Sequence, residues 1–209
     1  MEQFTLRFRL GSIPVVIEPW FWVMALVMGS NLRGPDILLW VGVVFVSILV
    51  HELGHAVASR AFGAQARIRL HSFGGLTYPD RKLKRSHEII MTLAGPFAGF
   101  ALAGVVYGLL YQFPWLALSP KVGVLASLTL SVNLWWGVIN LLPVPPLDGG
   151  HVALAVAGPR HERSVRVLAL LVSGAIVAWS LSEGSIYRAV LFGMLGYQNL
   201  QLMSRTSRA

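Results

Sequence analysis

The sequence contains no cysteine among its 209 residues. This absence excludes disulfide bonds and thiolate metal ligands, so any metal site in the chain has to use histidine, aspartate or glutamate. Charged residues are also scarce: they make up 12% of the chain, against roughly 25% in soluble proteins. Hydrophobic residues account for 55%, and the mean hydropathy is +0.64. These values exclude an ordinary soluble domain, and we expect a membrane protein.

Linkers and nucleic-acid motifs are absent too. No stretch rich in serine, proline and glycine separates the apolar segments, which favours a single integral domain over residues 1–209. The net charge of +8 is compatible with nucleic-acid binding. However, the basic residues lie between apolar segments rather than on an amphipathic helix. We therefore expect the lipid bilayer, and no nucleic acid, as their partner. The oligomeric state stays unknown.

Apolar segments of about 20 residues, the length that crosses a hydrocarbon core of about 30 Å, occur six times. The fold class that we expect is an all-α polytopic membrane protein with short β-hairpin elements at the cytoplasmic face. The first segment is the least regular because Pro14, Glu18 and Pro19 interrupt it, but we expect it to form a retained first helix. The expected transmembrane spans are residues 14–30, 37–60, 89–112, 122–142, 165–181 and 186–203.

The basic residues are distributed unevenly between the two sides that six alternating spans would create. Only Arg33, Lys121 and Arg188, of the 17 lysines and arginines, fall on one side. The positive-inside rule assigns the other, basic side to the cytoplasm. Both termini are then cytoplasmic. Removing the first span would move Arg7 and Arg9 across and weaken this asymmetry, so the charges favour six spans.

Two segments alternate polar and apolar residues, as half-buried β-strands do. The sequence ARIRLHS at residues 66–72 precedes the turn pair Gly74-Gly75, which predicts a β-hairpin over residues 66–78. The sequence TLRFRL at residues 5–10 alternates in the same way and predicts a further strand. Solvated loops are the alternative for both segments.

The sequence HELGH at residues 51–55 ends the second apolar segment. On a helix, His51 and His55 lie on the same face, where both imidazoles can bind one metal ion. Glu52 is placed to reach a water molecule on that ion, so this pattern combines two zinc ligands with a general base. Ionisable groups inside a membrane span cost several kcal/mol and persist where they serve a site or a water-filled cavity. The alternative is a helix-end cluster that reaches back to the interface.

A hydrolytic zinc site usually has three protein ligands and one open position for water. Three carboxylates in or near the apolar segments could supply the third ligand: Glu18, Glu88 and Asp148. Asp148 follows three prolines that break a helix, and it precedes two glycines that allow a sharp turn. Irregular backbone at membrane depth is tolerated where it is buried in protein or lines a cavity. This context favours Asp148.

Four motifs carry a resemblance to a known family. They are HELGH at 51–55, FGG at 73–75, AGPFAG at 94–99 and NLLPVPPLDGG at 140–150. The first and last resemble the paired signature of the site-2 protease family of intramembrane zinc metalloproteases, and the resemblance covers about residues 50–151 in the same order. One departure is Gly99, where members frequently have asparagine. The chain resembles the compact six-span branch, which has no PDZ or CBS module.

The resemblance implies a set of site residues. One zinc ion per chain would be bound by His51, His55 and Asp148. Glu52 would be the catalytic base, and Asn140 would hold the substrate backbone or stabilise the oxyanion. The residues that we assign to substrate binding are Gly74, Gly75, Pro143 and Pro145.

The resemblance also implies a function. Family members cleave transmembrane segments of other proteins, often after a first protease has shortened them. We therefore expect an intramembrane zinc endopeptidase in a prokaryotic cytoplasmic membrane. One alternative is a metal transporter or sensor, which would need several polar relay sites along its helices. The other is a silent relative that binds transmembrane segments without cutting them, against which the intact Glu52 argues. We expect His71 to be a solvated loop residue, and His151 to lie close to the site or at the surface.

Overall fold

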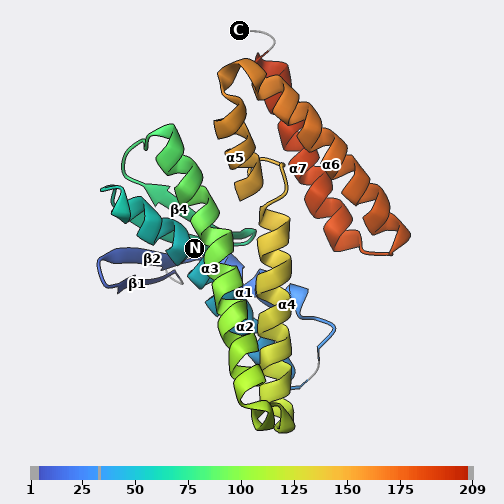
Figure 1. Cartoon of the computed structure of the whole chain (residues 1–209). Coiled ribbons are helices and arrows are strands. Elements are labelled where there is room, and N and C mark those ends of the chain that lie inside the picture. Colours follow the sequence, from blue (N-terminus) through green and yellow to red (C-terminus); the bar gives the residue numbers. More distant parts are fainter. Residues whose placement is uncertain (1–4, 33, 207–209) are drawn as a thin grey trace. The chain divides into compact units, whose positions relative to one another are not determined.

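The computed structural model describes residues 5–32 and 34–206 of the chain. It divides into two compact units, Met1–Val138 and Ile139–Ala209. Each unit is described by itself (Figure 1).

The first unit contains a four-stranded β-sheet. Its strands are β1 (Leu6–Leu10), β2 (Ile13–Ile17), β3 (Ala66–His71) and β4 (Gly74–Pro79). The strand order is β1-β2-β3-β4; β2 and β3 are parallel, and the outer pairs are antiparallel. The hairpin predicted over residues 66–78 and the strand predicted at residues 5–10 are both confirmed.

The alternation of residues in the sheet explains where its core lies. Val15 and Ile17 in β2, and Ile68 and Leu70 in β3, are almost fully buried, whereas the residues between them are more exposed. This apolar face packs against two helices that connect β2 to β3, α1 (Pro19–Met28) and α2 (Asp36–Ala61). The sheet is thereby fixed against the helix that carries the HELGH motif.

Three further elements complete the first unit. They are α3 (Arg85–Gln112), the 3₁₀ helix η2 (Pro114–Leu118) and α4 (Pro120–Asn140). Helices α2 and α3 approach closely because Gly54 has no side chain: a Cβ there would collide with the Ala94 carbonyl. Helix α3 runs beside α4 (Figure 1), and Phe100 packs against Gly137 at their contact.

The second unit contains a short helix followed by a helical pair. Its elements are α5 (Asp148–Ala157), the 3₁₀ helix η3 (Pro159–His161), α6 (Glu162–Ser182) and α7 (Ile186–Thr206). Helices α6 and α7 lie side by side (Figure 1). The turn between them contains Gly184, whose φ of 70° is in the left-handed region that favours glycine.

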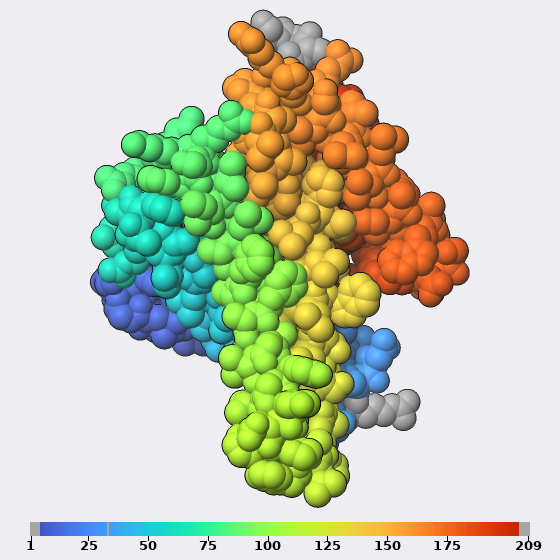
Figure 2. All heavy atoms as spheres, in the orientation of Figure 1, coloured from blue at the N-terminus to red at the C-terminus, as the bar shows by residue number. Residues whose placement is uncertain are grey.

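Within the described residues, four helices are long and apolar enough to cross a membrane: α2, α3, α4 and the segment Pro159–Ser182 that includes α6. They correspond to four of the six predicted spans. The last predicted span coincides with the 21-residue helix α7, which is not among these four. Many side chains on α3, which crosses the face shown in Figure 2, are apolar and exposed, including Phe97, Val105 and Tyr107. Such exposure is typical of a lipid-facing helix.

The prediction of a helix from residue 14 onward is wrong in its first part. Residues 14–17 belong to β2, where they pair with β1 and partly with β3. Helix α1 starts only at Pro19, a residue that is favourable in the first turn of a helix. It has 10 residues, or about 15 Å, which is shorter than a hydrocarbon core of about 30 Å. The count of six spans therefore stays a prediction.

Candidate metal centre

Helix α2 places His51, Glu52 and His55 together in the interior of the first unit. Their exposed fractions are 3%, 4% and 6%. The Nε2 atoms of His51 and His55 are 3.1 Å apart. This geometry follows from the spacing of four residues, which is about one helical turn.

The other ring nitrogen of His55 is hydrogen-bonded to the backbone. Its Nδ1 lies 2.8 Å from the Met91 carbonyl of α3. Because a carbonyl can only accept, Nδ1 carries a proton, and the nitrogen left to bind a metal ion is Nε2. A metal-binding histidine commonly has such a partner, which fixes its tautomer and ring orientation.

These donor atoms fit a divalent metal ion of the zinc type. The potential ligand atoms of His51, Glu52 and His55 all lie within 4.8 Å of one another. Two nitrogens bound tetrahedrally at about 2.0–2.1 Å would be roughly 3.3 Å apart, close to the 3.1 Å between the two Nε2 atoms. Two histidine nitrogens and a neighbouring carboxylate also form a donor set that zinc accepts.

Strand β4 covers Glu52 through a residue that the sequence analysis missed. The Thr77 hydroxyl lies 2.7 Å from Oε2 of Glu52 and 3.2 Å from its backbone carbonyl, so the shorter hydrogen bond holds the carboxylate. Thr77 lies in a predicted hairpin, but only the packing of β4 on α2 shows that it reaches Glu52.

Two glycines allow the backbone to approach the site. A Cβ on Gly75 of β4 would collide with the Glu52 side chain. A Cβ on Gly95 of α3 would collide with the His55 ring and lie 2.9 Å from Nε2 of His51. Gly74, at the start of β4, instead faces Trp136 of α4. Of the two glycines assigned to substrate binding, Gly75 therefore lies beside Glu52.

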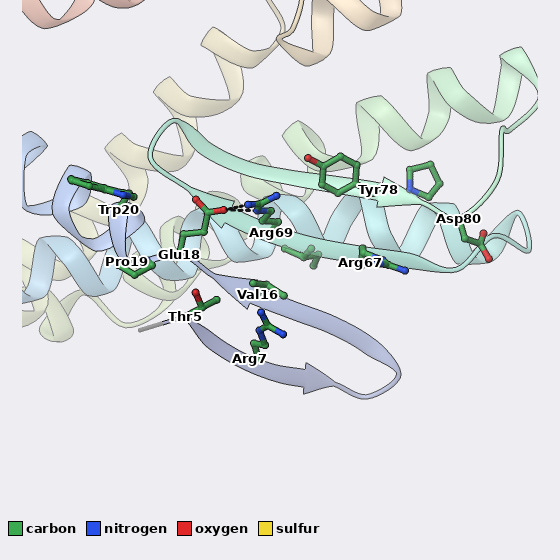
Figure 3. Close-up of a pocket in the computed structure, with 12 residues that line it drawn as sticks. Thr5, Arg7, Val16, Glu18, Pro19, Trp20, Arg67, Arg69, Tyr78 and Asp80 are labelled. Carbon is green, nitrogen blue, oxygen red and sulfur yellow. Dashed lines mark hydrogen bonds and ion pairs between the residues drawn. The ribbon is translucent and has the colours of Figure 1, made fainter. Parts of the chain in front are cut away.

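The first unit contains the other two carboxylates that the sequence offers as a third zinc ligand, Glu18 and Glu88. Glu18 accepts a hydrogen bond from Nε of Arg69 at 2.5 Å and forms an ion pair with that arginine. This pair lines a cavity of about 760 Å³ on the sheet, together with Arg7 and Arg67 (Figure 3). Glu88 lies in the first turn of α3. Within the described part of this unit, neither glutamate joins the histidine group.

The remaining predicted site residues belong to the second unit, which begins at Ile139 in the last turn of α4. Asn140 is the last residue of α4. Pro143 and Pro145 lie in the irregular loop that leads to α5, and Asp148 is the first residue of α5. Because His51 and Asp148 belong to different units, Asp148 as third ligand stays a prediction.

The loop before α5 is packed tightly against that helix. A Cβ on Gly149 would collide with the Leu141 carbonyl, and a Cβ on Gly150 would collide with the backbone nitrogen of Pro145. The two glycines after Asp148 therefore permit close backbone contact. His151 is exposed on α5, whereas the Nδ1 of His71 accepts a hydrogen bond from the Phe73 amide at 3.3 Å.

The sequence profile of peptidase family M50 matches residues 40–123 and 116–180. The chain belongs to peptidase family M50. The resemblance to the site-2 proteases is thereby confirmed. The matched residues include the HELGH motif and the loop that leads to Asp148.

Curated relatives of this family member carry zinc metalloprotease names. Rip3 of Mycobacterium tuberculosis is 30% identical over 195 residues, which cover 88% of this chain and 50% of Rip3. A zinc metalloprotease of Methanocaldococcus jannaschii is 29% identical over 160 residues, which cover 74% of this chain and 45% of that protein. The chain thus spans about half the length of these curated relatives.

A solved structure has the same fold. The site-2 protease from Methanocaldococcus jannaschii superposes with a TM-score of 0.67 at 21% sequence identity. The match covers 95% of this chain and 94% of that one. The predicted fold class, a helical membrane protein with small β-elements, is therefore confirmed for this M50 member.

Proposed function

We propose that this chain is an intramembrane zinc endopeptidase that hydrolyses a peptide bond in or near a transmembrane segment of another protein. The observation that carries the proposal is the buried group of His51, Glu52 and His55 on an apolar helix. Membership of family M50 and the zinc metalloprotease names of the relatives support it. The substrate would be a membrane protein, already shortened by another protease.

His51, His55 and Asp148 would hold the zinc ion. When bound there, the ion would supply Lewis acidity towards the scissile carbonyl and the attacking water. Glu52 accepts a proton from the attacking water at its carboxylate and delivers it to the leaving nitrogen. Thr77 holds that carboxylate in place, and burial of the group strengthens each electrostatic contact. Asn140 donates its amide N–H to the developing oxyanion.

The substrate has to be unwound before it can be cut, because a helix shields its peptide bonds in its own hydrogen bonds. Strand β4 is the last strand of the sheet, so it can pair with an extended substrate segment. The amide of Asp80, the residue after β4, donates to the carbonyl of Gln65, the residue before β3, at 2.8 Å. The Asp80 amide therefore points towards β3. Because amide directions alternate along a strand, the amides of Gly75 and Thr77 point to the open edge. The strand that would pair with the substrate, β4, is therefore also the strand that contacts Glu52.

Two substitutions of one residue test substrate pairing. Thr77→Val removes the hydroxyl but keeps the backbone amide, whereas Thr77→Pro removes both. A proline is tolerated on the open side of an edge strand, as the natural Pro79 shows on the same side of β4. We expect Thr77→Pro to raise the KM for a transmembrane substrate well above that of Thr77→Val. Equal KM values for the two variants would argue against pairing at this edge.

The main test compares wild-type protein with Glu52→Gln in bilayers, against a panel of single-span membrane proteins. The amide is isosteric with the carboxylate but cannot accept the proton. We expect wild type to cut, and Glu52→Gln to cut about 10²–10⁴-fold more slowly, with the same zinc content in both. Equal cutting by the two proteins would refute the mechanism. Zinc in neither preparation would refute the metal site.

A further inference from the structure

A buried polar chain links α6 and α7 to the loop that precedes Asp148. Its central residue is Asn199 of α7, whose exposed fraction is 0%. The Nδ2 of Asn199 lies 2.6 Å from the Pro145 carbonyl and 2.9 Å from the Leu195 carbonyl. Both amide protons are therefore used, one within α7 and one on the loop.

The orientation of the Asn199 amide is set by an arginine. Nη1 of Arg166 on α6 donates to Oδ1 of Asn199 at 3.3 Å. Because a guanidinium can only donate, it forces the oxygen of Asn199 towards α6 and the nitrogen towards the loop. Arg166 is itself only 8% exposed, and Glu162 balances its charge with hydrogen bonds of 2.9 Å and 2.6 Å.

The loop that Asn199 holds has few backbone donors: only Val144 and Leu147 can donate before Asp148, and both bond within the segment. Pro143, Pro145 and Pro146 cannot donate backbone hydrogen bonds. Pro145 also lies against Gly150, in the first turn of α5. A contact that fixes the Pro145 carbonyl thereby fixes the backbone on which Asp148 begins α5.

We propose that Asn199, oriented by the Arg166–Glu162 pair, is a positioning residue that holds the loop of residues 143–148 so that Asp148 is presented to the metal ion. The inference rests on the proposed function for Asp148 as a ligand. The Asn199 amide is fully buried and bonded to Arg166, Leu195 and Pro145, so the role that we assign to it is positioning and not metal binding. A buried arginine and asparagine in an apolar helical pair cost free energy unless they are fully hydrogen-bonded. Here one hydrogen bond of Asn199 leaves the helical pair and ends on the Pro145 carbonyl of the loop.

The variant that tests this role most directly is Asn199→Asp. It has the same shape and keeps an oxygen for Arg166, but it loses the N–H groups that bond the Pro145 and Leu195 carbonyls. Asn199→Ser is a second, neutral variant whose side chain is too short to reach both partners. The matched control is Ser180→Val, which changes a fully buried residue of α6 about four turns from Arg166.

Two measurements are made on each protein in bilayers. The first is hydrogen exchange of residues 142–151 without zinc, which reports the order of the loop independently of the metal. The second is the zinc dissociation constant from competition with a chelator. We expect both Asn199 variants to exchange faster in this segment and to bind zinc about 10-fold more weakly or worse. Ser180→Val replaces a buried hydroxyl that has no hydrogen-bond partner among the described residues, and it should change neither quantity.

Unchanged exchange in the Asn199 variants would overturn the proposal, and so would faster exchange with unchanged zinc affinity, because Asn199 would then have only a structural role. Asp148→Asn is measured alongside. If that variant binds zinc as wild type does, the proposed ligand set fails. The exchange experiment still decides whether Asn199 holds the loop.

Discussion

The two regions that supply the proposed zinc ligands hold them in different ways. In the first unit, His51, Glu52 and His55 lie on one regular helix, where each position follows from the helical repeat. In the second, Asp148 follows an irregular loop that depends on glycine packing and on Asn199. A helix satisfies most of its own backbone, whereas a proline-rich loop needs partners from elsewhere. The loop ligand should therefore be the more easily displaced by distant substitutions.

The largest difference is expected between a substitution of Glu52, which should affect only cleavage, and one of Asp148, which should also affect zinc binding. Glu52→Gln should reduce cleavage by about 10²–10⁴-fold while zinc content stays the same, because Glu52 transfers the proton. Asp148→Asn should reduce cleavage and also weaken zinc binding. The two variants are compared by single-turnover cleavage and by metal analysis. Loss of zinc in Glu52→Gln would show that this glutamate is a ligand.

A pair of glycine substitutions on α3 tests the helical region. Gly95→Ala places a methyl group against the His55 ring, so we expect zinc affinity to fall about 10–100-fold. Gly104→Ala is the matched control, because a Cβ there meets no atom within 4 Å. Both changes raise helix propensity equally. Equal zinc affinity of the two variants would mean that the histidines do not occupy the positions described.

A corresponding pair tests the loop region. Gly150→Ala would push a methyl group into the backbone of Val144 and Pro145, which cannot move aside as a flexible side chain can. We expect a loss of about 1–3 kcal/mol in unfolding free energy, measured by denaturation in mixed micelles. Gly174→Ala on α6 has open space and should be neutral or stabilising by up to about 1 kcal/mol. A stable Gly150→Ala would contradict the tight packing of the loop.

The smallest effect is expected where the sheet meets the helix. Thr77→Val removes the hydrogen bond to Glu52, and we expect cleavage to slow about tenfold, which is the lower end of the range for a hydrogen bond to a charged group, about 1.5–3 kcal/mol. Zinc affinity should stay at the wild-type value. Thr77→Ser keeps the hydroxyl and should restore most of the rate. If Thr77→Ser is as slow as Thr77→Val, the hydroxyl is not what positions Glu52.

Local patterns were enough to predict several elements. The spacing of His51 and His55 predicts their convergence, because a helix brings residues four apart onto one face whatever surrounds it. The alternation at residues 66–72 predicts β3 for a similar reason. By contrast, the prediction for the first apolar segment is wrong in its first part. Residues 14–17 form a strand because β1 and β3 flank them, and β3 lies far along the chain.

The sequence by itself determined the membrane class, the HELGH helix and the proline-broken loop before Asp148, because each depends on neighbouring residues or on overall composition. Only the tertiary structure decided that Thr77 holds Glu52, that Gly95 makes room for the histidine rings and that Asn199 holds the Pro145 carbonyl. Each of these contacts joins residues that lie far apart along the chain. No local pattern marks such partners, because their meeting depends on how helices and strands pack.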